Sequence, residues 1–372
     1  MSEHSVSNGH ASSGQAGTVT SAAATRGPLA MEALAVSKDF KLGHGQTVRA
    51  VRDVSFSLYR GAVVALVGES GSGKSTAARL LAGQERLTSG EIKLDGKPVE
   101  VTSRGDFRRY KSQVQYVFQD PFASLNPVHT VRYHLERPVK LRHGKDTDVD
   151  GEVVALMEQV RLTPPKHFLA KYPHELSGGQ RQRVSFARAL AARPSVLLAD
   201  EPVSMLDVSI RLEMLSLLDD LRQRFSLAML YITHDIASAR YFADEVLVMY
   251  AGEIVERGPA EEITQQPAHP YTQLLVASAP DPDNLGSSVL RRGRKGNGQR
   301  PGAGAAVHGQ QSVTTAGCPF HPRCPFADDR CRLQDPALLP ITATRGAACW
   351  HLDVAAPELA SGLPGGGRTT TN

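Results

Sequence analysis

Four short apolar runs punctuate the chain, at residues 63–67, 114–118, 196–199 and 228–233. Runs of this length with few polar residues are typical of strands buried on both faces of a parallel sheet. Between residues 121 and 179 the pattern turns helical, with apolar residues at turn spacing, and residues 245–258 alternate as a strand pair does. The sequence therefore predicts an α/β fold with a parallel sheet core and an inserted helical subdomain.

The same patterning divides the chain into five segments. We predict a disordered N-terminal arm, a globular domain, a flexible Gly-rich linker, a cysteine-containing extension and a disordered tail, at 1–28, 29–282, 283–316, 317–353 and 354–372. The arm is rich in Ser, Gly, Ala and Thr and lacks the apolar region of a signal peptide. Because the sequence has no internal repeat, we expect a single globular unit before the linker.

Composition narrows the function classes. A chain of 372 residues that is 41% hydrophobic can bury a large core and form two or three domains. Its formal net charge of +4 is too small to indicate a nucleic-acid partner, and no basic stripe is interleaved with aromatic residues. No stretch approaches the roughly 18 consecutive apolar residues that a membrane helix needs. We therefore expect no nucleic-acid binding and no membrane span in this chain.

A phosphate-binding loop follows the first apolar run directly and leads into a helix-forming stretch. Its backbone N–H groups can turn toward the β- and γ-phosphates of a nucleotide, Lys74 can reach the same oxygens, and the Ser75 hydroxyl can bind Mg²⁺. A flexible Gly/Ser turn would explain neither the strand before it nor the helix after it. We expect ATP or GTP to bind through Gly68, Glu69, Ser70, Gly71, Ser72, Gly73, Lys74, Ser75 and Thr76.

A second glycine turn opens an amphipathic helix much further along the chain, at Leu176-Ser177-Gly178-Gly179-Gln180. Two anion-binding helix N-termini for one nucleotide suggest that two chains share each ATP. With this motif the sequence resembles the ATP-binding cassette (ABC) family over about residues 34–280. The resemblance implies a P-loop ATPase with an N-terminal antiparallel β subdomain, and trans contacts to ATP from Ser177, Gly178, Gly179, Gln180 and the D-loop residue Asp207.

Two carboxylates end the apolar run at 196–199, where ligands bind in parallel sheets. Asp200 would hold Mg²⁺, and Glu201 would polarise the attacking water as general base. A solvated strand end is the alternative interpretation of this pair, and it is disfavoured by the neighbouring motifs. The resemblance adds Gln119 as a further Mg²⁺ ligand and His234 as a contact to the γ-phosphate.

Phe40 is placed like the aromatic residue that stacks on adenine in the family, although a core aromatic is the rival interpretation. A lone histidine such as His234 at a strand end is, by itself, more often only hydrogen-bonded. Met205 stands beside the D-loop aspartate where the family more often has Ala.

All four cysteines lie in the extension, at Cys318, Cys324, Cys331 and Cys349. Clustered thiols in a reducing compartment favour a metal site over disulfides. Four thiolates suit Zn²⁺ or an Fe–S cluster, with His321 and His351 as nearby substitutes. The absence of close CxxC pairs favours the cluster. Inert buried cysteines are the remaining alternative.

The extension also narrows the resemblance. Residues 317–325, 269–272, 118–127 and 172–176 resemble ATPases of dipeptide and oligopeptide importers. The resemblance implies ATP hydrolysis at the cytoplasmic face of the membrane. It also implies two transmembrane permease subunits and an external solute-binding protein. The partner cassette would be a paralogous ATPase, with a homodimer as the alternative. Oligosaccharides or nickel are alternative cargoes. A soluble ABC ATPase without a membrane partner is the alternative of another class, whereas a small-molecule kinase would leave LSGGQ unexplained.

Overall fold

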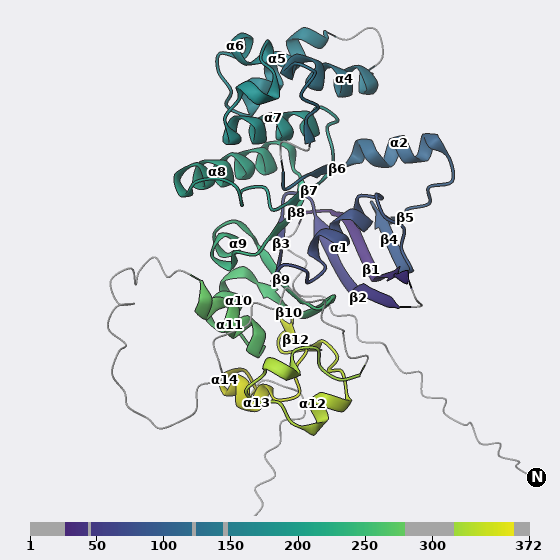
Figure 1. The fold of residues 1–372 in the computed structure, drawn as a ribbon, viewed down its shortest axis with the longest axis vertical. Helices are drawn as coiled ribbons and strands as arrows, with labels where there is room; N and C mark the ends of the chain where they lie inside the picture. The colour runs from purple at the N-terminus through teal and green to yellow at the C-terminus, as the bar shows by residue number, and fades with distance from the viewer. Residues whose placement is uncertain (1–26, 44–45, 121–123, 144–147, 280–315, 361–372) are drawn as a thin grey trace, which may run out of the picture.

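The computed structural model describes residues 27–43, 46–120, 124–143, 148–279 and 316–360. A large mixed sheet runs through the molecule, with a smaller antiparallel sheet on one side, several helices on the other and a group of helices at the top (Figure 1). The predicted N-terminal arm and Gly-rich linker lie almost wholly outside the described residues. Within the described part, no helix is both long and apolar enough to cross a membrane.

The large sheet has eight strands in the order β11-β12-β10-β9-β3-β8-β7-β6. Its central strands, from β9 across to β6, run parallel, and β10, β12 and β11 continue it as antiparallel strands. The strands are β3 (Val63–Val67), β6 (Val114–Val117), β7 (Val196–Asp200), β8 (Ala228–Thr233), β9 (Glu245–Tyr250), β10 (Glu253–Pro259), β11 (Leu339–Pro340) and β12 (Gly346–Ala347). The four apolar runs therefore form the predicted parallel core, and β9 and β10 are the predicted strand pair.

Burial on both faces explains why these strands are apolar throughout. Alternate residues of β3 enter two different cores: Val63, Ala65 and Val67 pack into one, and Val64 and Leu66 into the other. The second core lies under the antiparallel sheet β2-β1-β4-β5. That sheet consists of β1 (Leu29–Lys41), β2 (Thr47–Tyr59), β4 (Ser89–Leu94) and β5 (Lys97–Pro98), as the family resemblance implies.

Helices cover the large sheet and form the inserted subdomain. The main ones around the sheet are α1 (Lys74–Leu81), α2 (Arg104–Gln113), α8 (Val208–Phe225), α9 (Ile236–Phe242), α10 (Ala260–Gln265) and α11 (Pro270–Ser278). The subdomain stands at the top of Figure 1 and contains α4 (Val131–His143), α5 (Val149–Gln159), α6 (Pro165–Leu169) and the start of α7 (Gly178–Leu190).

The C-terminal extension packs against the edge of the large sheet. It contains the 3₁₀ turn η5 (His321–Arg323) and the helices α12 (Asp329–Leu333), α13 (Leu352–Ala355) and α14 (Pro357–Ala360). Strand β12 pairs with β10, and beside this pairing Arg345 donates to the Glu256 carboxylate at 2.8 Å. The two side chains are 1% and 0% exposed. Glu256 also accepts the backbone N–H groups of Ala268 and His269, so its buried charge is well compensated.

Helices α13 and α14 correct one expectation, because residues 354–360 were predicted to belong to a disordered tail. Leu352 and Ala356 are buried with Ile341, Ala268 and Ala347 in a small apolar cluster. These few contacts order the two short helices, and the sequence alone gives little sign of them because only two of the buried side chains lie on the helices and their flanks.

Candidate functional site

The phosphate-binding loop lies between β3 and α1, as predicted. Gly73 is the residue before α1 and has φ +105°. A Cβ there would lie 2.3 Å from the carbonyl oxygen of Ala50, and a Cβ on Gly68 would lie 2.2 Å from that of Met249. Only glycine fits at these two positions, because backbone passes directly beside them. The first turn of α1 contains Ser75 and Thr76 and no acidic residue, which suits an anion.

Lys74 is buried and points back into the loop. Its Nζ donates to the carbonyl oxygens of Gly68 and Glu69, each at 2.8 Å. Burial lowers the pKa of Lys74, and the carboxylates of Glu201, Asp200 and Glu69 oppose that shift. The ammonium is therefore held inside the loop by backbone oxygens, within reach of any phosphate that the loop cradles. Ser72 is buried beside it, whereas Ser70 and Gly71 form the exposed tip of the loop.

Asp200 ends β7 next to the loop. Its Oδ1 accepts from the Ser75 hydroxyl at 3.0 Å, and its Oδ2 accepts from the Tyr116 hydroxyl at 2.5 Å. Two oxygen donors suited to Mg²⁺, Ser75 Oγ and Asp200 Oδ1, thus lie side by side. Tyr116 was not singled out from the sequence; burial and the Asp200 charge raise its pKa. Its position in β6, the strand paired with β7, is the signal that identifies it.

Glu201 follows directly and collects two further motif residues. Its Oε2 accepts from Gln119 Nε2 at 3.0 Å and lies 3.2 Å from His234 Nδ1. Glu201 itself has φ +45°, a left-handed conformation that costs a non-glycine residue about 1–3 kcal/mol. The strained backbone turns the carboxylate out of the strand direction toward these partners. Because Gln119, Glu201 and His234 follow β6, β7 and β8, they meet at the carboxyl edge of the parallel sheet.

The LSGGQ segment forms the start of α7 and is self-contained. The Ser177 hydroxyl accepts from the Gln180 N–H at 3.3 Å, and the Gln180 side chain accepts the Ser177 N–H at 3.0 Å. This reciprocal capping holds the turn of Gly178 and Gly179 without using the loop of the same chain. Among the described residues, the side chains of Ser177 and Gln180 hydrogen-bond only within this turn.

Asp207 precedes α8 and does not cap it with its side chain. It is exposed, as are the apolar side chains of Met205, Val208 and Leu212 around it. Exposed apolar residues gathered at one helix start are typical of a surface that another chain covers.

Phe40 lies on β1 and is only partly buried. It belongs to neither of the two large buried cores, and the Lys38 ammonium lies 4.8 Å from its ring centre. The core-aromatic interpretation is therefore disfavoured, and the ring is available to a flat ligand.

The cysteines of the extension are all free thiols, two of them buried and two half-buried. Burial raises the pKa of Cys318 to about 12 and that of Cys349 to about 11. The Cys318 N–H donates to the Cys331 carbonyl oxygen at 2.8 Å, and the Cys349 thiol accepts the His351 N–H at 3.4 Å. The most compact set of metal-ligating atoms, however, is Asp328, Cys331 and His351, all within 4.8 Å of one another. His351 was anticipated as a substitute ligand; Asp328 was not. His321 instead bonds the Cys318 carbonyl oxygen through Nδ1 at 2.8 Å.

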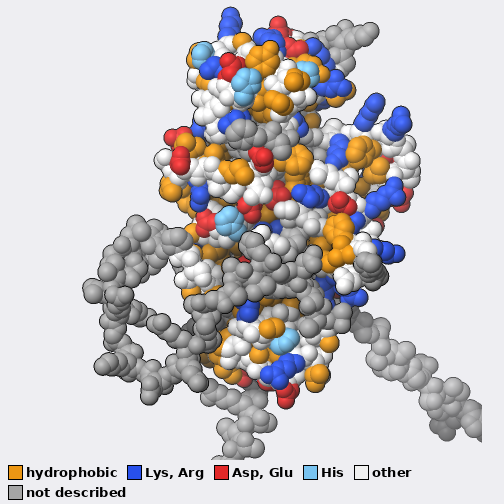
Figure 2. Space-filling view, viewed as in Figure 1, with side chains coloured by type: hydrophobic (Ala, Val, Ile, Leu, Met, Phe, Trp, Pro, Cys, Tyr) orange, Lys and Arg blue, Asp and Glu red, His pale blue; other side chains and the backbone are white. Residues whose placement is uncertain are grey.

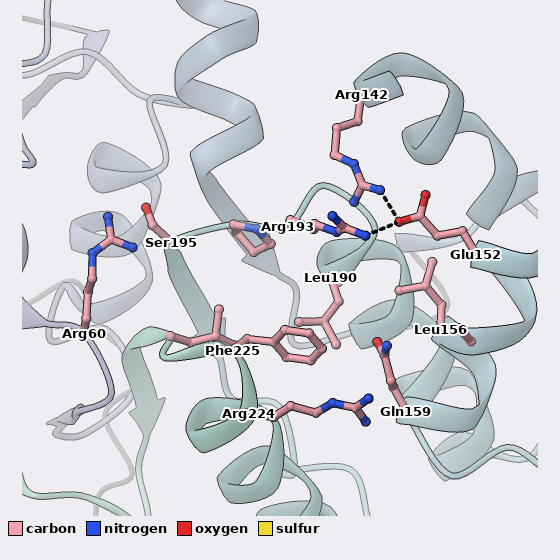
Figure 3. A pocket seen from close by; sticks show the side chains of 13 residues that line it. Arg60, Arg142, Glu152, Leu156, Gln159, Leu190, Arg193, Ser195, Arg224 and Phe225 are labelled. Carbon is pink, nitrogen blue, oxygen red and sulfur yellow. Dashed lines mark hydrogen bonds and ion pairs between the residues drawn. The ribbon is translucent and has the colours of Figure 1, made fainter. Parts of the chain in front are cut away.

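A cavity of about 570 Å³ lies apart from all these motifs, between α5 of the helical subdomain and the C-terminal end of α8 (Figure 3). Its arginines largely have acidic partners: Arg142 and Arg193 both contact Glu152, and Arg60 pairs with Asp95. The cavity contains none of the residues of the phosphate loop or its neighbours. It is a polar seam between two subdomains and takes no part in the site described above.

Comparisons with known proteins agree with this geometry. The family model described as "ABC transporter" matches residues 51–204, and the one described as "Oligopeptide/dipeptide transporter, C-terminal region" matches residues 255–331. The chain is 42% identical to a di/tripeptide transport ATP-binding protein, DppF, of Pseudomonas aeruginosa, over 86% of this chain and 94% of that protein. It is 40% identical to a probable peptide ABC transporter ATP-binding protein of Sinorhizobium fredii, over 81% and 82%.

Solved structures of ABC ATPases also resemble the ATPase part of this chain. The structure of cbiO1 from Clostridium perfringens, part of the ABC transporter complex cbiONQ, aligns with a TM-score of 0.57 and 26% identity over 63% of this chain and 90% of that one. The ATP-binding cassette MJ0796, solved as a dimer bound to ADP and Pi after hydrolysis, aligns with a TM-score of 0.57 and 27% identity over 62% and 98%. This chain belongs to the ABC transporter family, as an ATPase cassette with the C-terminal region of oligopeptide/dipeptide transporters.

Proposed function

We propose that this chain powers a peptide importer by hydrolysing ATP at the cytoplasmic face of a membrane. The observation that carries the proposal is the convergence of the phosphate loop, Asp200, Glu201, Gln119 and His234 at one sheet edge, in a chain whose extension matches the oligopeptide/dipeptide transporter region. Relatives named as peptide transport ATP-binding proteins support peptides as the cargo.

In this proposal each side chain has one task. The loop N–H groups and Lys74 hold the β- and γ-phosphates, and Phe40 stacks on the adenine. Ser75, Asp200 and Gln119 would hold Mg²⁺, which supplies charge neutralisation to the phosphates. Glu201 orients and deprotonates the attacking water, and His234, 3.2 Å from the Glu201 carboxylate, contacts the γ-phosphate.

The proposal requires a second cassette. The LSGGQ turn keeps its hydrogen bonds to itself, and Met205, Val208 and Leu212 expose an apolar surface near Asp207. Both features suit a partner chain that places its own phosphate loop against Ser177–Gln180, so that each ATP lies between two cassettes. We propose a paralogous ATPase as this partner, with a homodimer as the alternative, together with two transmembrane permease subunits and an external solute-binding protein.

We further propose that the extension binds a metal. The donor set that supports this is Asp328, Cys331 and His351, whose ligand atoms lie within 4.8 Å of one another, and the free thiols of Cys318, Cys324 and Cys349 would complete a Zn²⁺ site or an Fe–S cluster. Metal, iron and acid-labile sulfide analysis of the purified protein tests this. A metal-free preparation with an intact melting transition would discard the metal site.

The function is tested by affinity purification of the Glu201→Gln variant from its native membrane in ATP, followed by mass spectrometry. We expect two permease subunits and a second ATPase to copurify, with peptides on the solute-binding protein. Sugars or nickel on the solute-binding protein would leave the assignment as an importer ATPase in place and change the proposed cargo. If no membrane protein copurifies, the soluble ABC ATPase becomes the better interpretation.

The proposal includes no nucleic-acid partner. On the face that Figure 2 shows, Lys and Arg side chains of the described residues are interspersed with Asp and Glu and form no continuous basic stripe.

A further inference from the structure

The phosphate loop contains an acidic residue, Glu69, two positions before Gly71 at the exposed tip of the loop. A carboxylate beside a site for a polyphosphate is electrostatically unfavourable, because like charges repel across a few ångströms. Glu69 is close enough to Lys74 for its charge to influence the pKa of that ammonium. ATP binding to this loop therefore requires that the Glu69 charge be compensated.

The compensation comes from the far end of the sequence. Arg323 in η5 makes a two-pronged ion pair with Glu69, from Nη1 to Oε2 at 2.9 Å and from Nη2 to Oε1 at 2.9 Å. This pairing is the dominant reason that the pKa of Arg323 is raised. A planar guanidinium that meets both carboxylate oxygens in parallel is the strongest geometry for such a pair. The two side chains are 37% and 43% exposed, so added salt will screen the pair.

A second contact joins the same two regions through the backbone. The Tyr271 hydroxyl accepts the Glu69 N–H at 2.8 Å. Tyr271 lies in α11, immediately before the linker, and is fully buried. Glu69 is therefore held twice, by its carboxylate and by its N–H, from residues that lie in the region matched as the oligopeptide/dipeptide transporter C-terminal region.

An aromatic cluster fixes the direction of Arg323. Its guanidinium lies 5.6 Å from the ring centre of Phe320 and 5.9 Å from that of Tyr250. Phe320 in turn packs edge-on against Tyr250 and tilted against Tyr271, with ring centres 5.4 and 5.5 Å apart. Phe320 and Arg323 stand between Cys318 and Cys324, so the fold of the cysteine segment decides where the guanidinium points.

We propose that Arg323 is a positioning residue of the ATP site, through which the folded C-terminal extension sets the affinity of the phosphate loop for ATP. With the extension docked, the guanidinium neutralises Glu69 and holds the loop open toward phosphate. When the segment around Cys318 and Cys324 is displaced, the uncovered carboxylate repels ATP. The inference rests on the proposed assignment of this loop to ATP, and it adds a control from a region outside the phosphate loop.

The test measures the dissociation constant (Kd) of ATP, and KM and kcat of hydrolysis, in the full chain. Arg323→Gln should raise Kd and KM about fivefold, the scale of one partly screened charge contact, and leave kcat nearly unchanged. The effect should shrink between low and high salt. The double variant Arg323→Gln/Glu69→Gln should bind ATP tightly again, because residue 69 then has no negative charge for Arg323 to neutralise. Arg332→Gln, which removes an exposed pair with Asp329 in the same extension, is the matched control and should bind like wild type.

Three outcomes overturn the inference. The first is an unchanged Kd in Arg323→Gln. The second is a double variant as weak as Arg323→Gln alone, which would make Arg323 merely an anchor for the extension. The third is a loss of affinity that is equal at all salt concentrations. Melting temperatures measured without ATP show whether each variant is folded, so a loss of affinity in a folded Arg323→Gln variant is not a folding defect. Failure of the wild-type chain to bind ATP would instead refute the proposed function.

Discussion

Acid should weaken this protein through one buried histidine, His269. The residue precedes α11, is 1% exposed, and accepts the Tyr271 N–H on Nδ1 at 3.0 Å. Burial lowers its pKa to about 3, so the imidazole stays neutral in the folded protein. In the unfolded chain the same group titrates near 6.5. Between these values the unfolded state binds one proton more than the folded state, and the stability it contributes above pH 6.5 is lost as the pH falls.

The size of the effect follows from the two pKa values. Each pH unit below 6.5 costs about 1.36 kcal/mol, so acidification from pH 7.5 to pH 5 should remove about 2 kcal/mol of the free energy of unfolding. For a domain of this size that is a fall in melting temperature of about 4 °C. The loss continues down to about pH 3, where the folded protein also takes up the proton.

One carboxyl group in β10, Glu253, acts in the opposite direction. Burial and the nearby Asp335 raise the pKa of Glu253 to about 7, against an ordinary value of 4.5. Its folded form binds a proton more readily than its unfolded form, so this group stabilises the fold below pH 4.5 and loses that contribution as the pH rises through 7. The pH dependence of the free energy of unfolding therefore contains contributions from both groups. Substitution of His269 separates its contribution from that of Glu253.

The assay compares wild type with His269→Asn by denaturant unfolding from pH 7.5 to 5. Asparagine keeps an acceptor for the Tyr271 N–H but does not titrate. We expect the variant to be less stable at pH 7.5 and the gap between the two proteins to narrow by about 2 kcal/mol at pH 5. A gap of constant size across this range would refute the reasoning, because it would mean that His269 binds no extra proton on unfolding.

Two further predictions concern the extension and the loop. Arg345→Met should leave the Glu256 carboxylate buried without its ion-pair partner and lower the free energy of unfolding by about 3–5 kcal/mol. We expect earlier proteolysis and a lower melting temperature, and an unchanged melting temperature would contradict the role of this pair. Lys74→Ala should raise the Kd for ATP by at least about tenfold, measured by a fluorescent ATP analogue, since Nζ is the cation held inside the loop. An unchanged Kd would count against the loop assignment.

The parallel core and the carboxyl-edge placement of the motifs could be predicted because both depend on local sequence. An apolar run reports a buried strand by itself, and residues that follow parallel strands must meet at one edge. Glu201, His234 and Gln119 lie where that reasoning places them, around the single oxygen Glu201 Oε2.

Contacts with the extension could not be predicted in the same way. Arg323 and Glu69 are separated by 254 positions, and nothing in the periodicity of either segment points to the other. The order of residues 354–360 likewise depends on a small cluster that joins residues 341–359 to the distant Ala268. The contact between Tyr116 and Asp200 follows from the pairing of β6 with β7. The sequence predicts these strands but not their order in the sheet, so this contact could not be predicted.

The most direct measurement is ATP turnover and ATP-dependent association of Glu201→Gln, beside the matched variant Glu261→Gln at an exposed pair in α10. If Glu201 is the general base of a shared ATP site, Glu201→Gln should keep its Kd for ATP, lose at least about 100-fold in kcat, and associate stably in ATP with the partner cassette, while Glu261→Gln behaves as wild type. Turnover near the wild-type rate in Glu201→Gln would contradict this account of the site.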